Sequence, residues 1–118
     1  MRYMFLVYSV ENGEPNLDLM QSVAQRHRQI MDEAARIGVF ESAEPLKPTS
    51  TATTVRTDNG KVLLLDGPFA ETKEQLAGYY ILNCKDLDEA IEWAKKIPTG
   101  CKGGEGCIEI RPLLEGMH

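Results

Sequence analysis

Apolar side chains follow two different spacings along the first third of the chain. They fill almost every position of 2–8, which predicts a β-strand that is apolar on both faces. After a polar loop, they recur every three or four residues, which predicts a helix over 17–37. Asn16 is its expected N-cap, and Gly38 is the expected residue just beyond its end. The apolar stripe of this helix comprises Leu17, Met20, Ala24, His27, Met31 and Ala34.

The middle of the chain has the pattern of extended structure. Segment 39–47 is expected to be extended and is followed by two strands, 51–56 and 61–65. These strands flank Asn59-Gly60, a dipeptide typical of tight hairpins because both residues accept a positive φ. The polar segment 70–75 is expected to hold a short turn of helix.

A strand, a helix and a strand are predicted in the last third. Strand 76–84 is apolar on both faces, and the final strand, 108–112, alternates apolar and polar residues. Between them, helix 87–97 begins after Asp86, with Glu89 at the third helical position, and stops at Pro98.

This order of elements predicts one α+β domain over 1–118. The pattern is βαββαβ with an inserted hairpin, for which the economical architecture is ferredoxin-like. Two helices cover only one face of such a sheet, yet strands 2–8 and 76–84 carry apolar residues on the other face too. A second copy packed face to face would remove that surface from water. We therefore expect a homodimer that forms a dimeric α+β barrel.

Composition narrows the classes of partner. The 118 residues are 42% hydrophobic and carry a net charge of −5, and no basic patch suited to nucleic acid is visible. No apolar run is long enough to cross a membrane, so no membrane association is expected. The lack of a secretory signal and the odd cysteine count, three, predict a cytoplasmic protein with reduced thiols.

Two of the cysteines, Cys101 and Cys107, flank a glycine-rich loop. Their spacing is not that of a zinc site, and no further ligand stands nearby, so no metal is expected. Two free thiols are the default interpretation, and a redox-linked bridge is the alternative. No motif for a nucleotide is present either, and we expect no cofactor.

Asp66 begins the loop Asp66-Gly67-Pro68-Phe69 at the end of an apolar strand. If its carboxylate faces a cleft, it can serve as a general base or bind a polar group of a ligand. The alternative is structural, because an Asp before Gly-Pro also fixes a turn by accepting backbone N–H groups. Both interpretations stay open at this point.

Further candidate residues lie on the predicted helix and strands. His27 sits on the apolar stripe, where an imidazole paired with a carboxylate such as that of Asp66 would shuttle protons. A structural histidine is the alternative. Tyr79 and Tyr80 must point to opposite faces of their strand, so one faces the helices and the other a dimer cleft. Arg56 is a candidate for binding a substrate carboxylate, or for an ordinary salt bridge.

The segment from Asp66 to Leu76, followed by Gly78-Tyr79-Tyr80, resembles the signature of the DGPF proteins, a branch of the YCII-related family. Segments 53–56, 86–90 and 108–112 resemble neighbouring blocks of that family. The resemblance implies a dimeric α+β barrel and places Phe69 with the ligand-binding residues. His27, eleven residues before Gly38, resembles a histidine that YCII-type proteins pair with an aspartate in their suspected active site.

Two functions follow as hypotheses. The first is a cofactor-free acid–base enzyme, of isomerase or lyase type, acting on a small organic or aromatic acid. Its catalytic residues would be His27 and Asp66, and its binding residues Tyr79, Tyr80, Phe69 and Arg56. The second is a non-catalytic ligand-binding or regulatory module. Genes for alternative sigma factors often lie beside those of DGPF proteins, which links this module to transcription control.

Overall fold

The structure is a computed structural model that describes residues 1–11, 17–99 and 106–115. The expected N-cap Asn16 and Cys101 lie outside these residues. In chain order, the elements are β1 (Arg2–Val10), α1 (Leu17–Arg36), β2 (Phe40–Pro45), the short 3-10 helix η1 (Thr49–Thr51), β3 (Thr53–Asp58), β4 (Lys61–Asp66), β5 (Glu74–Asn83), α2 (Leu87–Lys96) and β6 (Gly106–Pro112). Both predicted helices and the predicted strands are confirmed to within a few residues.

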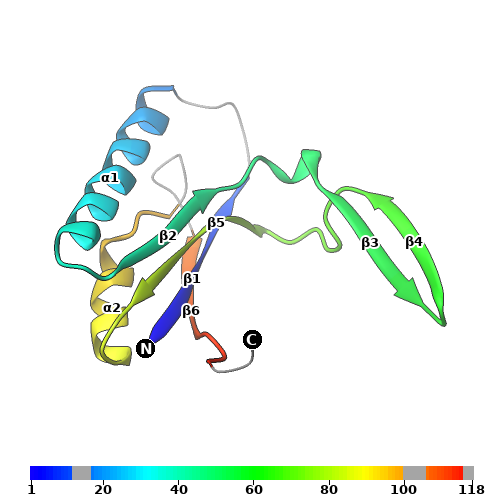
Figure 1. The fold of residues 1–118 in the computed structure, drawn as a ribbon. Helices are drawn as coiled ribbons and strands as arrows, with labels where there is room; N and C mark the ends of the chain where they lie inside the picture. The colour runs from blue at the N-terminus through cyan, green and yellow to red at the C-terminus, as the bar shows by residue number, and fades with distance from the viewer. Residues whose placement is uncertain (12–16, 100–105, 116–118) are drawn as a thin grey trace.

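Four strands form an antiparallel sheet in the order β2-β5-β1-β6. The first strand of the chain therefore lies inside the sheet, where Phe5 pairs with Tyr80 of β5 and with Ile110 of β6. Both helices cover the same face of this sheet (Figure 1). The architecture is mixed α+β and is consistent with the ferredoxin-like arrangement that the sequence predicts.

The core lies between the sheet and the two helices. Burial alternates along β1, because successive side chains of a strand point to opposite faces. The helix-facing residues Phe5 and Leu82 are fully buried, and Trp93 of α2 closes the layer. The predicted cap of α2 is confirmed: the Glu89 N–H donates to the Asp86 carboxylate at 2.9 Å, and the Lys85 N–H donates to the Glu89 carboxylate.

The other face of the sheet has no covering layer among the described residues. It carries Met4, Leu6, Tyr8, Tyr79 and Ile81, all of which are half-buried, and we call it the open sheet face. The prediction that β1 and β5 are apolar on both faces is thus confirmed.

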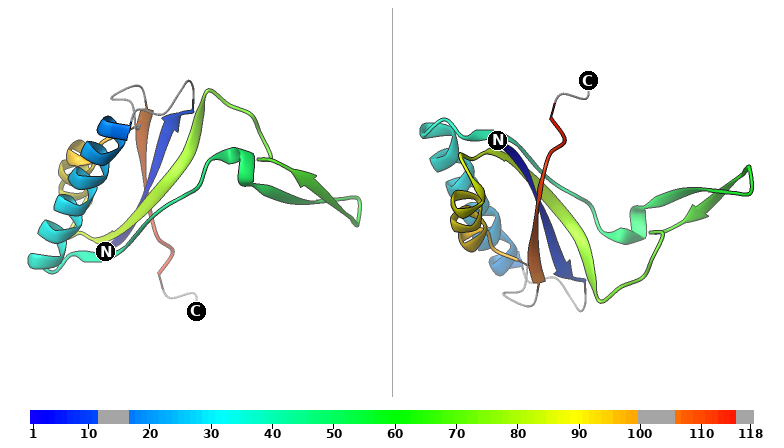
Figure 2. Two further views of the ribbon diagram at one scale, coloured as in Figure 1. Left: turned by 90° about the horizontal axis from the view of Figure 1, so that it is seen from above. Right: turned by 90° about the horizontal axis from the view of Figure 1, so that it is seen from below.

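The hairpin β3–β4, which we call the arm, forms a separate two-stranded sheet. Its turn uses Asn59 and Gly60, with φ values of 50° and 80°, as the dipeptide predicts. The arm projects away from the body on the side of the main sheet opposite the helices (Figure 2). Most of its apolar side chains are therefore in water, including Val55, Val62, Leu63, Leu64 and Leu65.

Two local predictions are wrong. Segment 70–75 holds no helix; the Thr72 hydroxyl donates to the Glu74 carbonyl, and β5 begins there. The apolar stripe of α1 is also shifted. Its buried residues are Val23, Ile30 and Ala34, whereas Leu17 is 70% exposed. The reason is that the apolar surface of α1 is wider than the part that packs on the sheet.

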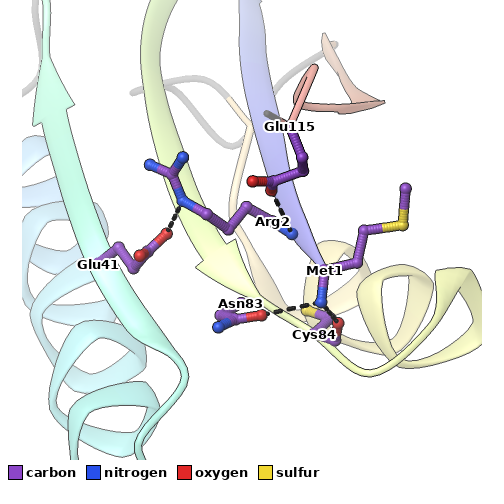
Figure 3. A network of polar contacts seen from close by, with 6 residues as sticks. All are labelled: Met1, Arg2, Glu41, Asn83, Cys84 and Glu115. Carbon is purple, nitrogen blue, oxygen red and sulfur yellow. Dashed lines mark hydrogen bonds and ion pairs between the residues drawn. The ribbon is translucent and has the colours of Figure 1, made fainter. Parts of the chain in front are cut away.

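One end of the sheet is fixed by polar contacts (Figure 3). The Arg2 guanidinium donates to the Glu41 carboxylate at 2.6 Å, which ties β1 to β2 across the intervening strand β5. The Met1 amino group donates to the Asn83 side chain and the Cys84 carbonyl, each at 2.9 Å. The Arg2–Glu41 pair holds the beginning of β2, while the other end of β2 borders the cavity described next. Within the described residues, neither helix has the length and apolar character needed to span a membrane.

Candidate functional site

A cavity of about 410 Å³ lies between α1 and the β2–β5 edge of the sheet. Its helical wall contains much of the stripe that the sequence predicts, since Met20, Ala24, His27 and Met31 all line it. The stripe was therefore wrong as a description of the packed core, but it marks the face of α1 that borders the cavity. The opposite wall comes from the end of β2, the middle of β5 and Pro98.

Gly78 allows the two strands of that wall to lie close together. A Cβ atom at this position would stand 2.8 Å from the carbonyl oxygen of Glu44 and 3.2 Å from the Cα of Pro45. Opposite Gly78, the register of β1 against β5 shifts between Val7 and Tyr8. Such an irregularity re-aims side chains near a site, and here it lies beside the cavity.

His27 and Tyr80 meet inside the cavity. The Tyr80 hydroxyl lies 2.5 Å from Nδ1 of His27, with the ring centroids 5.8 Å apart. Tyr80 is only 3% exposed, and His27 is half-buried. The two side chains come from α1 and β5, which the fold packs together, although 53 residues separate them in the chain.

Burial keeps both groups neutral near pH 7. Burial, with a smaller effect of the Arg26 guanidinium, lowers the pKa of His27 below its ordinary value of 6.5. Burial raises the pKa of Tyr80 to about 12. The pair therefore consists of a neutral imidazole and a neutral phenol joined by one hydrogen bond.

One charged side chain accompanies this neutral pair. Arg28 lines the cavity and is exposed. Within the described residues, it takes part in no ion pair or side-chain hydrogen bond. Glu44 of β2 also belongs to the cavity wall, but it pairs with Tyr79, so its side chain lies with that of Tyr79 on the open sheet face. An apolar cavity thus has a neutral donor–acceptor pair in its wall, together with one free cation from that part of the chain.

The other predicted site residues lie elsewhere in the single chain. Asp66, Phe69 and Arg56 do not line this cavity. Arg56 and Asp66 are exposed on the arm, and Phe69, just beyond it, is 75% exposed. Tyr79 belongs to the cavity wall as a residue of β5, but strand alternation places its side chain on the open sheet face. One chain therefore joins His27 to Tyr80 and not to Asp66.

The loop after Asp66 closes the base of the arm. The Thr54 hydroxyl donates to the Gly67 carbonyl at 2.8 Å, and the Gly67 N–H donates to the Ala52 carbonyl at 2.7 Å. Gly67 has a φ of 96°, a conformation that favours glycine. The Asp66 carboxylate makes no hydrogen bond within the described residues, so Thr54 and Gly67 fix this turn without it.

A second, more polar cavity of about 390 Å³ lies at the base of the arm. Its carboxylate at Glu11 accepts hydrogen bonds from the Thr49 hydroxyl at 2.6 Å and from the Thr49 N–H at 3.1 Å. These bonds tie the end of β1 to η1. The carboxylate is therefore used internally, and the His27 cavity is the better candidate for a ligand.

Metal ligands and reactive thiols are not gathered in the part of the chain that the structure describes. Cys84 is buried, and its pKa is raised to about 11, chiefly by burial. Cys107 is exposed, and slight desolvation of its thiol together with the Glu74 carboxylate raises its pKa. Both thiols are protonated near neutral pH, which makes them poor nucleophiles.

Sequence reasoning missed Arg28, Glu44 and the pairing of Tyr80 with His27. Arg28 follows His27 directly, and Glu44 lies in a segment predicted to be extended, but nothing in the local pattern marks either as a cavity residue. For Tyr80, strand alternation required one of two adjacent tyrosines to face the helices. That signal was available, and it identified the face without identifying the partner.

The fold and site define a small α+β protein with an apolar, histidine-containing cavity beneath α1. The sequence profile of the YCII-related domain matches residues 1–116. The chain therefore belongs to the YCII-related domain family. It is also 35% identical, over 119 residues, to the uncharacterized protein R00369 of Rhizobium meliloti (strain 1021), an alignment that covers 96% of this chain and 92% of that protein.

Proposed function

We propose that this protein binds a small molecule in the His27 cavity and acts on it by acid–base chemistry. The hydrogen bond between His27 and Tyr80 carries the proposal. It places two titratable groups in the wall of an otherwise largely apolar cavity, both with a shifted pKa, and such groups concentrate at functional sites. The cavity size suits a small organic or aromatic molecule.

The reaction class that these groups support is proton transfer on carbon next to an acidic or carbonyl function. The neutral His27 supplies a hydrogen bond to the oxygen on which charge develops, and the Asp66 carboxylate, which the single chain places outside this cavity, acts as the base from the arm of a second copy. A base and a hydrogen-bond donor suffice for isomerisation or elimination, so the proposal requires no cofactor.

The functional unit in this proposal is a homodimer of the DGPF branch, closed into a barrel. Two observations support a second copy as the partner. The open sheet face is apolar, and the arm, also apolar, projects on that same side. One two-fold contact would cover both surfaces in both copies. Asp66, Arg56 and Phe69 then act from the arm against the second copy, and Tyr79 acts from the shared face.

The test combines binding and turnover. Matched libraries of small carboxylic acids and their amides are screened for binding by NMR, and bound compounds are assayed for proton exchange at carbon in deuterated water. Asp66→Asn is expected to lower exchange by about 10²-fold or more, the usual contribution of a general base, while binding stays within a few fold. Ser22→Ala, on the exposed part of α1, is the control and is expected to match the wild type.

Three other outcomes are informative. Full exchange in Asp66→Asn would show that Asp66 is not the base and would remove the arm from the proposed reaction. Binding without exchange for every bound compound would favour the non-catalytic ligand-binding or regulatory module. Absence of any binding at the His27 cavity across the library would overturn the proposal.

A further inference from the structure

The Tyr80 hydroxyl has one proton and, within the described residues, one acceptor for it. That acceptor is Nδ1 of His27. If Nδ1 carried a proton instead, the phenol proton would be left without a partner in a buried environment, which costs about 1–3 kcal/mol. The hydrogen bond therefore runs from the hydroxyl to Nδ1, and the neutral imidazole carries its proton on Nε2.

The Nε2–H group is available to a ligand. It has no hydrogen-bond partner within the described residues. No buried side-chain nitrogen or oxygen there lacks a partner, and His27 is not an exposed residue, so Nε2 must be an accessible atom. Because His27 lines the cavity, this N–H is a donor that a bound molecule can reach.

Arg28 gives the same cavity a positive charge. Its side chain is exposed, lines the cavity and has no ion-pair partner within the described residues. A guanidinium presents several N–H groups in a planar fork that matches a carboxylate. Beside the two polar groups, Met20, Met31 and Pro98 provide an apolar wall.

We propose that the His27 cavity recognises a monoanion with an apolar body, a carboxylate whose oxygens accept hydrogen bonds from His27 Nε2–H and the Arg28 guanidinium. Tyr80 is the positioning residue that keeps the imidazole in its donating form. This inference deepens the proposed function and rests on it. It also assigns His27 the role of donor to the ligand, because Nδ1 is occupied by Tyr80 and Nε2 already carries the proton.

The charged groups that face His27 favour such an anion. From α1, these are Arg26 and Arg28, and Arg26 also donates to the Lys96 carbonyl at the end of α2. From β2, Glu44 pairs with Tyr79, so its carboxylate lies on the open sheet face, away from His27. From β5, Tyr80 stays neutral, since burial raises the pKa of its hydroxyl to about 12. We expect binding to weaken at high salt, because Arg28 is exposed.

The first experiment needs no ligand. Nitrogen-15 NMR distinguishes a protonated imidazole nitrogen from an unprotonated one, and His27→Gln identifies the signals of His27 against those of His118. We expect Nε2 to be the protonated nitrogen at pH 7.5. We also expect Tyr80→Phe, which keeps the ring but removes the hydroxyl, to give a mixture of both tautomers. A wild-type His27 protonated on Nδ1 would overturn the proposal while leaving the cavity free to bind other molecules.

The second experiment uses paired probes that differ only in charge. Benzoate with benzamide, cinnamate with cinnamamide, and hexanoate with hexanamide are titrated while the His27 signals are followed. Each acid is expected to bind about tenfold tighter than its amide, the size of one charge-assisted hydrogen bond. Arg28→Gln should remove most of this difference. Arg36→Gln, an exposed arginine on the same helix that does not line the cavity, should keep it.

Outcomes that contradict the inference are separable from those that contradict the proposed function. Amides that bind as tightly as their acids, or an Arg28→Gln variant that keeps the full preference, would overturn the anion site and leave a small-molecule site standing. If no pair shifts the His27 signals at millimolar concentration, both fail for this size class of ligand.

Discussion

At the scale of single residues, the partner of His27 decides what the histidine can do. A carboxylate partner would stabilise the charged imidazolium and favour a proton shuttle. The Tyr80 hydroxyl does neither, because it is uncharged and donates its own proton. His27 is thereby a neutral hydrogen-bond donor in a largely apolar wall, which suits recognition of an oxygen atom better than storage of a proton.

The lowered pKa of His27 predicts a dependence of stability on pH. Below pH 6.5, the unfolded chain binds a proton at His27 that the folded chain resists. The free energy of unfolding should therefore fall as the pH drops from 6.5 towards the folded-state pKa, and His27 should add no pH dependence above that window. Urea denaturation of the wild type and of His27→Gln at pH 7.5 and 5.5 measures this.

The comparison isolates His27, because all carboxylates and His118 are common to both proteins. We expect the wild type to lose more stability than the variant on acidification. Equal losses in the two proteins would show that burial does not oppose protonation of this imidazole.

Sequence reasoning reached half of the candidate site at this scale. His27 was identifiable because a titratable side chain stood on an apolar helical stripe. The partner within the chain was not, because it depends on which strand residue lies under the helix, a tertiary fact. The Asp66 pairing stays a prediction that requires a second copy, since the single chain places Asp66 outside the cavity.

At the scale of elements, the position of β2 against β5 sets the shape of the cavity. Its beginning is held by the Arg2–Glu41 ion pair, and its end crosses close over Gly78. Both ends of a short edge strand are thus constrained, and its residues Ala43, Glu44 and Pro45 form part of the cavity wall.

Replacing Gly78 tests this constraint. A methyl group there meets backbone atoms of Glu44 and Pro45, which cannot rotate away as a side chain would. Gly78→Ala is expected to cost about 1–3 kcal/mol, typical of overpacking, and to displace the backbone of β2 that forms part of the cavity wall. Denaturation and binding of the NMR probes are the measurements.

Gly38→Ala is the matched control. Its φ of 85° makes alanine strained, at about 1 kcal/mol, but no atom stands within 4 Å of the new methyl group. It should lose stability and keep probe binding, whereas Gly78→Ala should lose both. Unchanged probe binding in Gly78→Ala would mean that β2 does not shape the cavity.

The elements themselves were largely predictable, because period-two and helical patterns, Asn59-Gly60 and the Asp86 cap are local signals. The helix predicted for segment 70–75 is absent because polar side chains there, those of Thr72 and Gln75, bond to the backbone instead. The register shift between Val7 and Tyr8 was also not predicted, because Gly78, which stands opposite it, does not by itself specify a shift.

At the scale of the whole molecule, two apolar surfaces share one side of the sheet. The sequence predicted the first, the open sheet face, from strands that are apolar on both faces. It also predicted the hairpin, but not that the arm would leave the body. The direction of the arm depends on the segments that join it to β2 and β5, for which no local rule exists.

The proposed homodimer predicts matched effects from both surfaces. Leu6→Gln on the open sheet face and Leu64→Gln on the arm should each raise the dimer dissociation constant by about tenfold or more, because each removes apolar area from one interface twice. Analytical ultracentrifugation is the measurement. Leu87→Gln is the control, since Leu87 is also an exposed leucine but belongs to α2, on the face of the sheet opposite the arm.

A wild-type protein that sediments as a monomer at micromolar concentration would contradict the dimer. If Leu6→Gln weakens the dimer and Leu64→Gln does not, the open sheet face belongs to the interface and the arm does not. The proposed action of Asp66 on the second copy would then be wrong.

The central place of β1 has a consequence for when the protein can fold. β1 pairs with β5 and β6, so Tyr3 must wait for Pro112 before its strand has both neighbours. During synthesis, a strand that is apolar on both faces is therefore made before both of its neighbours; it gains its first partner once β5 has been made and its second only after β6. Only the arm, whose strands are adjacent in sequence, can pair early. The main sheet pairs segments that are distant in the chain, so it forms slowly and late. Until it forms, β1 is the segment that most needs protection from aggregation.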